Sequence, residues 1–127
     1  MHAIALLDRH QYLSLATYRS TGAEVRTPVW FAAVDDALMV VSSGDAGKVK
    51  RLRRSSRARV APCDVRGGVE GRWQEATARI VTDPDAIARA HRALRAKYRW
   101  KMRMLDLVSR LGGRIKNRAW IEIALGA

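Results

Sequence analysis

Strand-forming runs joined by short turns fill the first two thirds of the chain, and their order constrains the fold more than any other feature. The alternation of apolar and polar residues predicts five strands in succession, at residues 12–18, 24–34, 38–42, 58–63 and 71–81. A short basic helix follows the third strand. Consecutive strands with tight turns favour a mostly antiparallel barrel.

The last third of the chain predicts a long helix and a closing strand. Asp83 can cap the helix, Pro84 is tolerated at its first position, and the pattern continues towards residue 110 with a break near Arg99. A sixth strand is expected over residues 118–125, and a short helix over residues 3–10. We therefore expect one domain, residues 1–127, that is mainly β: a six- to seven-stranded barrel with α-helices.

Pro28 departs from the strand pattern because it lies inside the second predicted strand. Proline has no N–H group to donate to a neighbouring strand. Its segment is therefore expected at an edge or a bulge of the barrel, where backbone groups are left free for a ligand.

The stretch from residue 42 to residue 57 carries the strongest indication of a ligand. An apolar strand ends there in Ser42 and Ser43, a glycine-containing turn follows, and a helix begins that carries the basic residues Lys48, Lys50, Arg51, Arg53 and Arg54. The N–H groups in the first turn of a helix lack internal partners, so a strand, a turn and a helix start form an anion site. The alternative is a solvated helix that only maintains solubility.

Helical geometry divides these basic side chains. Lys48 and Arg51 share one sector of the helix, beside an apolar stripe of Val49 and Leu52 that can hold the helix against the barrel. Lys50 and Arg54 point away from that stripe.

The overall charge agrees with an anionic partner but does not identify it. The chain has 24 Lys and Arg against 12 Asp and Glu, a net charge of +12, which would attract nucleic acid, an acidic membrane or a charged small molecule. One cysteine permits no internal disulfide and no cysteine cluster for zinc. Because no apolar run approaches the roughly 20 residues of a membrane span, and no signal-peptide pattern is present, a cytoplasmic location is expected.

Several segments together resemble a known family. With the 27–31 strand (Thr-Pro-Val-Trp-Phe) and the 47–53 helix in their order, the chain resembles the pyridoxamine-5′-phosphate-oxidase-like proteins, in the branch of small actinobacterial deazaflavin-dependent oxidoreductases. Residues 12–17, 60–67, 76–79 and 97–98 support the match. The resemblance implies an FMN-binding split β-barrel, a homodimer with cofactor sites at its interface, and coenzyme F420 as cofactor, with FMN as the alternative.

The resemblance also assigns site residues. It implies that the cofactor ring is lined by Thr27, Pro28, Val29 and Trp30. It implies that Ser42 and Ser43 bond the ribityl or phosphate groups, that Lys48 and Arg51 bind phosphate, and that Arg54 or Arg57 lies near an acidic tail.

The function implied is an F420-dependent oxidoreductase that transfers hydride between the reduced deazaflavin and a hydrophobic or planar organic substrate. The alternatives are an FMN- or haem-binding protein and a non-catalytic F420 carrier. A nucleic-acid binder is disfavoured, because the clustered aromatic platform of such modules is missing. No catalytic acid or base and no metal site is expected, since His2, His10 and His91 are dispersed and Cys63 suits a buried packing position.

The aromatic residues leave more than one interpretation open. Trp30 can stack against the cofactor or fill the barrel, whereas Trp73 and Trp120 suit the core or the dimer interface. The segment 98–104 can flank a substrate pocket or touch a membrane surface, but the interpretation that we favour is an amphipathic packing helix.

Overall fold

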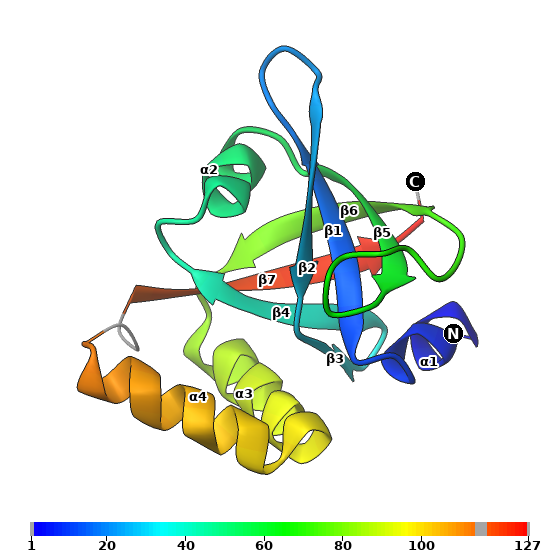
Figure 1. Cartoon of the computed structure of the whole chain (residues 1–127). Helices are drawn as coiled ribbons and strands as arrows, with labels where there is room; N and C mark the ends of the chain where they lie inside the picture. The colour runs from blue at the N-terminus through cyan, green and yellow to red at the C-terminus, as the bar shows by residue number, and fades with distance from the viewer. Residues whose placement is uncertain (1, 114–116, 127) are drawn as a thin grey trace.

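The computed structural model describes residues 2–113 and 117–126, and it has the expected mainly β architecture (Figure 1). The strands are β1 (Tyr12–Tyr18), β2 (Glu24–Val29), β3 (Phe31–Val34), β4 (Ala37–Ser43), β5 (Arg57–Cys63), β6 (Gln74–Val81) and β7 (Arg118–Leu125). The helices are α1 (His2–Asp8), α2 (Gly47–Arg54), α3 (Pro84–Tyr98) and α4 (Trp100–Leu111). The predicted single strand over residues 24–34 is wrong: it divides at Trp30 into β2 and β3.

The strands form one curled antiparallel sheet in the order β2-β1-β5-β6-β7-β4-β3. β2 and β3 are separated in the chain by Trp30 alone, yet they are the two opposite edges of this sheet. The sheet must therefore curl until its edges approach each other, which produces a barrel that is split between β2 and β3. Pro28 lies on the edge strand β2, as its missing N–H group predicts.

Alternating residues of the strands face two separate cores. Leu38 and Val40 of β4 face the interior of the curled sheet, where α2 contributes Val49 and Leu52. Met39, between them, faces the opposite side and packs against α3 and α4 in a second core, whose members are Ala32, Met39, Val81, Ala90, Leu94, Tyr98, Met102 and Trp120. Because successive residues of a strand face opposite sides of the sheet, α2 packs against the interior of the barrel and the α3–α4 pair packs against its outside (Figure 1).

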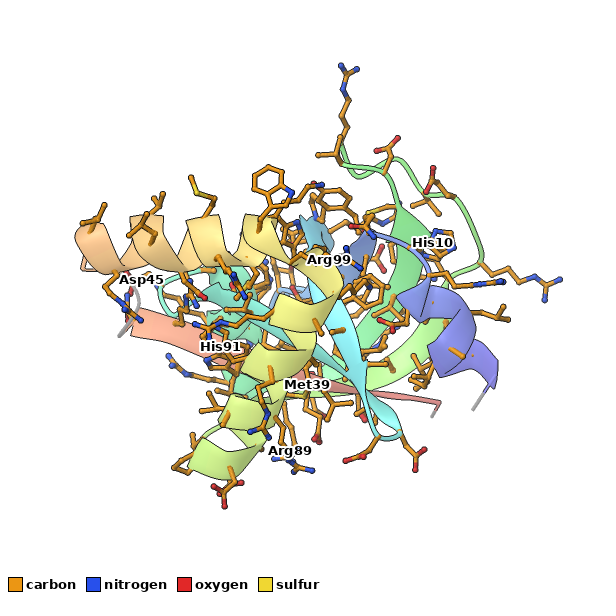
Figure 2. All side chains as sticks on the ribbon, turned by 90° about the horizontal axis from the view of Figure 1, so that it is seen from below. His10, Met39, Asp45, Arg89, His91 and Arg99 are labelled. Carbon is orange, nitrogen blue, oxygen red and sulfur yellow. The ribbon has the colours of Figure 1, made fainter. Side chains whose placement is uncertain are left out.

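The C-terminal helical region starts and breaks where the sequence predicts. The side chain of Asp83 accepts a hydrogen bond from the amide of Ala86 (3.0 Å), and Pro84 occupies the first turn. Arg99 has a φ of 54° and separates α3 from α4. Figure 2 shows Arg99 at the corner where the two helices meet. Within the described residues, no helix has the length and apolar character needed to cross a bilayer.

Two of the remaining sequence predictions are confirmed, and a third is tested only in part. Trp120 and Cys63 are buried, and burial, followed by the charges of Asp64 and Glu70, raises the pKa of the Cys63 thiol. Trp73 belongs to neither core, and the other half of its prediction, a place in a dimer interface, stays a prediction. Its ring is part-buried, and the guanidinium groups of Arg26 and Arg59 lie 4.5 and 4.9 Å from the ring centre.

Candidate functional site

A hollow of about 350 Å³ lies at the split of the barrel. β2 and β4 approach each other there, although they are not hydrogen-bonded neighbours in the sheet. The hollow is lined by Tyr12, Pro28, Val29, Trp30, Val41, Ser42, Lys48 and Leu105. Five of the ten site residues implied by the resemblance therefore lie around one space, because the curl of the sheet brings β2, β4 and α2 together.

Trp30 forms a flat wall of the hollow and is held from behind by Tyr98. The two rings are stacked, with centroids 4.5 Å apart and planes inclined by 10°. The Tyr98 hydroxyl accepts a hydrogen bond from the amide of Phe31 (3.0 Å) and lies within donating distance of the carbonyl oxygens of Gln11 (2.8 Å) and Phe31 (3.1 Å). Burial raises the pKa of Tyr98 far above its ordinary value, so the hydroxyl stays protonated. Tyr98 therefore fixes both the break between β2 and β3 and the plane of Trp30.

Lys48 brings a positive charge to the rim of the hollow. It is half-buried, and within the described residues it has neither a hydrogen bond nor an ion pair with a carboxylate. Burial, followed by repulsion from Arg51, lowers the pKa of its ammonium group. The N-cap of α2 is Ala46, which offers no side-chain cap, and the first turn contains no acidic residue. An unneutralised lysine thus lies at an uncapped helix N-terminus, an arrangement that favours an anion.

Arg51 lies behind Lys48 and not on the wall of the hollow. Its Nε donates a hydrogen bond to the buried hydroxyl of Thr17 (2.7 Å). Its Nη1 would lie 2.7 Å from a Cβ at Gly47, so the guanidinium rests against the first turn of α2. Arg51 therefore adds positive potential near Lys48 while it also anchors α2 to β1.

The structure places the other implied residues away from the hollow. Arg54 donates a hydrogen bond to the carbonyl of Tyr18 (3.2 Å), and the guanidinium of Arg57 lies 4.1 Å above the Tyr18 ring, so both belong to the far end of β1. Ser43 is exposed beyond the rim. Thr27 faces the barrel interior, and its buried hydroxyl oxygen has no hydrogen-bond partner within the described residues.

Three lining residues, Tyr12, Val41 and Leu105, are not among the site residues that the sequence suggested. The sequence could have suggested Val41 as a lining residue, because it precedes the serines at the end of its strand. No sequence feature points to Leu105, since its position depends on how α4 folds back after Arg99. Leu105 lies one residue beyond the segment 98–104, for which a helix that flanks a substrate pocket was one of the open interpretations.

A second hollow, of about 280 Å³, adjoins the first through Val41, Ser42 and Leu105, and its other lining residues are Ser43, Ser109 and Arg118. Behind it, the buried carboxylate of Asp106 accepts hydrogen bonds from Arg118 (2.7 Å), His91 (3.0 Å) and Arg95 (3.1 Å). Burial opposes ionisation of Asp106, but these hydrogen bonds outweigh it and hold the pKa below its ordinary value. Asp106 therefore ties α4 to α3 and β7 beside the site.

The histidines are as dispersed in space as in sequence. His91 lies on the side of α3 that faces α4 (Figure 2), whereas His10 lies 3.9 Å from Glu70 at the other end of the molecule. The side chain of His2 is outside the part of the chain that the structure describes. Among the described residues, no group of three or more His, Cys, Asp and Glu side chains is placed to hold a metal ion.

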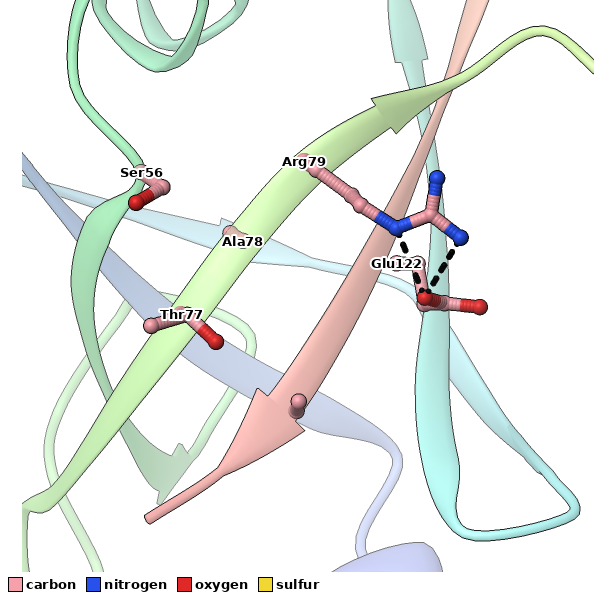
Figure 3. A pocket seen from close by; sticks show the side chains of 6 residues that line it. Ser56, Thr77, Ala78, Arg79 and Glu122 are labelled. Carbon is pink, nitrogen blue, oxygen red and sulfur yellow. Dashed lines mark hydrogen bonds and ion pairs between the residues drawn. The ribbon is translucent and has the colours of Figure 1, made fainter. Parts of the chain in front are cut away.

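A slightly larger hollow, of about 370 Å³, lies on the outer face of β6 and β7 and is a weaker candidate (Figure 3). Its charged residues, Arg79 and Glu122, pair with each other at 2.9 Å and so leave no free charge for a ligand. It contains none of the residues that the sequence suggested. The hollow at the split is therefore the better candidate for the functional site.

Comparison with known proteins agrees with this architecture. The chain resembles conserved hypothetical protein Rv2991 from Mycobacterium tuberculosis, with 20% identity over 99% of this chain and 79% of that one and a TM-score of 0.75. It also resembles the haem storage protein HutZ from Vibrio cholerae (12% identity, 99% and 89% coverage, TM-score 0.73). A third similar structure is named F420 reductase (18% identity, 97% and 92% coverage, TM-score 0.62). At these identities the likeness shows the fold.

The family is shown by the sequence itself. No curated protein matches the chain. The sequence profile described as pyridoxamine 5′-phosphate oxidase, however, matches residues 2–126, which is nearly the whole length. The curled sheet, its split edge and this match lead to one conclusion: the chain belongs to the pyridoxamine 5′-phosphate oxidase-like family of split β-barrel proteins.

Proposed function

We propose that this protein is an F420-dependent oxidoreductase that transfers hydride between reduced F420 and a hydrophobic or planar organic substrate. The observation that carries the proposal is Lys48, a half-buried lysine without a carboxylate partner among the described residues, at the uncapped start of α2 and on the rim of a hollow with an aromatic wall. A ligand that suits this hollow is planar at one end and anionic at the other. F420 has both features, and one of the similar structures is named F420 reductase.

The residues of the hollow fit such a cofactor. Trp30, fixed by Tyr98, offers a flat apolar surface to a ring, and Pro28 and Val29 continue that surface along β2. Lys48 and the amides of Gly47 and Lys48, at the start of α2, would hold the phosphate, with Ser42 beside them.

The bound cofactor would supply the hydride chemistry, and the protein would bind, orient and exclude water. Trp30, Val41 and Leu105 contribute apolar surface to the lining. The ionisable residues of the lining are Tyr12 and Lys48, and we assign neither of them a catalytic proton transfer. The second hollow, which shares Val41, Ser42 and Leu105 with the first, would hold the substrate beside the ring.

Titration of the purified protein with F420 and with FMN, followed by fluorescence, tests the proposal. We expect micromolar or tighter binding of F420 and no binding of FMN. Lys48→Ala should weaken F420 binding at least about tenfold, or about 1.4 kcal/mol, because it removes a charge-assisted contact. Lys50→Ala, an exposed position on the same helix, is the matched control and should bind as the wild type does. Equal losses in the two variants would show that Lys48 is not the anion site.

The same experiment separates the alternatives. Binding of FMN without F420 would identify a flavin protein, and uptake of haem would point to the function for which HutZ is named. F420 binding without turnover of any hydrophobic acceptor would indicate a carrier. We further propose a homodimer that shares its cofactor sites, as the family resemblance implies, and light scattering of the purified protein would measure its mass.

A further inference from the structure

The outer face of α4 carries an apolar stripe that has no partner within the described residues. Five side chains, each between 51% and 80% exposed, make up the stripe: Trp100, Met104, Leu107, Val108 and Leu111. At about 100° per residue they fall within a sector of about 100° on the helix surface. Figure 2 shows a row of α4 side chains directed away from the rest of the molecule.

The opposite side of α4 is firmly attached. Met102 is fully buried, and the Asp106 carboxylate holds Arg95 and His91 of α3 and Arg118 of β7. The favoured sequence interpretation of a packing helix is therefore right for Met102 and wrong for Trp100 and Met104. Because α4 is anchored in this way, its stripe faces outward as a consequence of the fold.

Basic residues border the stripe on both sides. Lys101 lies on one flank and Arg103 and Arg110 on the other, and all three are exposed. Asp106 is the sole acidic residue of α4 and is buried, so the exposed face carries positive charge only. An apolar stripe between rows of Lys and Arg, with an aromatic residue at one end, is the pattern of a helix that lies in the surface of a membrane.

We propose that the stripe on α4 docks this protein onto an anionic lipid bilayer. The helix has 12 residues and is about 18 Å long, too short to span a bilayer but suited to lie flat on one. A second copy of this chain fits the stripe less well. Two α4 helices packed together in either direction would place the basic flanks of one helix beside the basic flanks of the other. Anionic headgroups neutralise those flanks while the stripe enters the acyl boundary.

This proposal is independent of the cofactor, so it can be tested on the protein alone. Sedimentation with vesicles of phosphatidylglycerol and phosphatidylcholine should carry the wild type down, whereas vesicles of phosphatidylcholine alone should carry much less. Leu107→Ser combined with Leu111→Ser should reduce the bound fraction at least about tenfold, because both side chains are exposed and act only in the docked state. A blue shift of tryptophan fluorescence on the vesicles should disappear in Trp100→Phe.

A charge-matched pair of variants separates α4 from the general basicity of the chain. The triple variant Lys101→Gln, Arg103→Gln, Arg110→Gln should lose most of the binding, and the control Lys50→Gln, Arg66→Gln, Arg72→Gln, also at exposed positions, should retain it. Equal losses in the two triple variants would overturn the proposal, as would a wild type that stays in solution with anionic vesicles. A fall in solution mass caused by the Leu107 and Leu111 changes would also overturn it, since a second copy would then cover the stripe.

Discussion

Removal of one buried hydroxyl group, by Tyr98→Phe, tests how the wall of the site is held. The Tyr98 hydroxyl accepts a hydrogen bond from the amide of Phe31, its single proton lies within donating distance of the carbonyls of Gln11 and Phe31, and the residue is 4% exposed. The phenylalanine ring keeps the packing but leaves these backbone groups without a partner. An unsatisfied buried group costs about 1–3 kcal/mol, so we expect a loss of about 2–3 kcal/mol in the free energy of unfolding. For a chain of this length the Tm should fall by about 10 °C.

Urea unfolding of wild type and variant measures this loss, and near-UV circular dichroism reports the packing of Trp30 against the ring. Tyr12→Phe is the matched control, because its hydroxyl has no hydrogen bond within the described residues although it lines the same hollow. That change should alter stability by less than about 0.5 kcal/mol. If Tyr98→Phe were as mild as Tyr12→Phe, the hydroxyl would not be what holds the break between β2 and β3.

Two further predictions concern the supports of the site. Asp106→Asn should destabilise the protein by about 3 kcal/mol or more, because it leaves the nearly buried Arg118 without its carboxylate. The pKa of Asp106 is lower in the folded state than in the unfolded state. Its carboxylate therefore stabilises the fold fully above the unfolded pKa of about 3.9, and this stabilisation is lost as the pH falls through the folded pKa. In urea unfolding measured from neutral to acid pH, the free energies of unfolding of the variant and the wild type should converge. Gly44→Ala should cost about 1–3 kcal/mol, since its Cβ would lie 2.7 Å from the backbone carbonyl of Asn117. Gly47→Ala meets only the movable end of Arg51 and should be milder in the same thermal-unfolding assay; the reverse order would contradict the close approach of Gly44 to the Asn117 backbone.

Local sequence patterns were sufficient to predict most of the helices and strands. The alternation in β1 and β4, the cap at Asp83 and the break at Arg99 are each specified by neighbouring residues, so the sequence predicts them. The division at Trp30 was missed because residues 24–34 form one continuous strand-forming run in the sequence. That break is imposed by Tyr98, which is distant in sequence and bonds the Phe31 backbone.

The candidate site likewise has features that neighbouring residues predict and features that depend on tertiary contacts. Residues 44–54 are sufficient to predict the basic helix and its uncapped start. Helix periodicity then predicts that Lys48 and Arg51 lie on one side of it. The sequence could not separate the bases that face the hollow from those that contact β1, since Arg54 and Arg57 turn to Tyr18 only once β1 lies beside α2. Leu105 likewise joins the wall through the anchoring of α4 by Asp106.

The sequence by itself determined the class of fold, the edge position of Pro28 and a basic helix start ready for an anion. These depend on backbone chemistry and on periodicities of two and about 3.6 residues, which act over short distances. Only the tertiary structure decided that β2 and β4 face each other across a split, that Trp30 is a fixed wall, and that the apolar stripe of α4 points outward. Those features arise from contacts between segments far apart in the chain, whose partners are chosen by the curl of the sheet and the packing of the two cores.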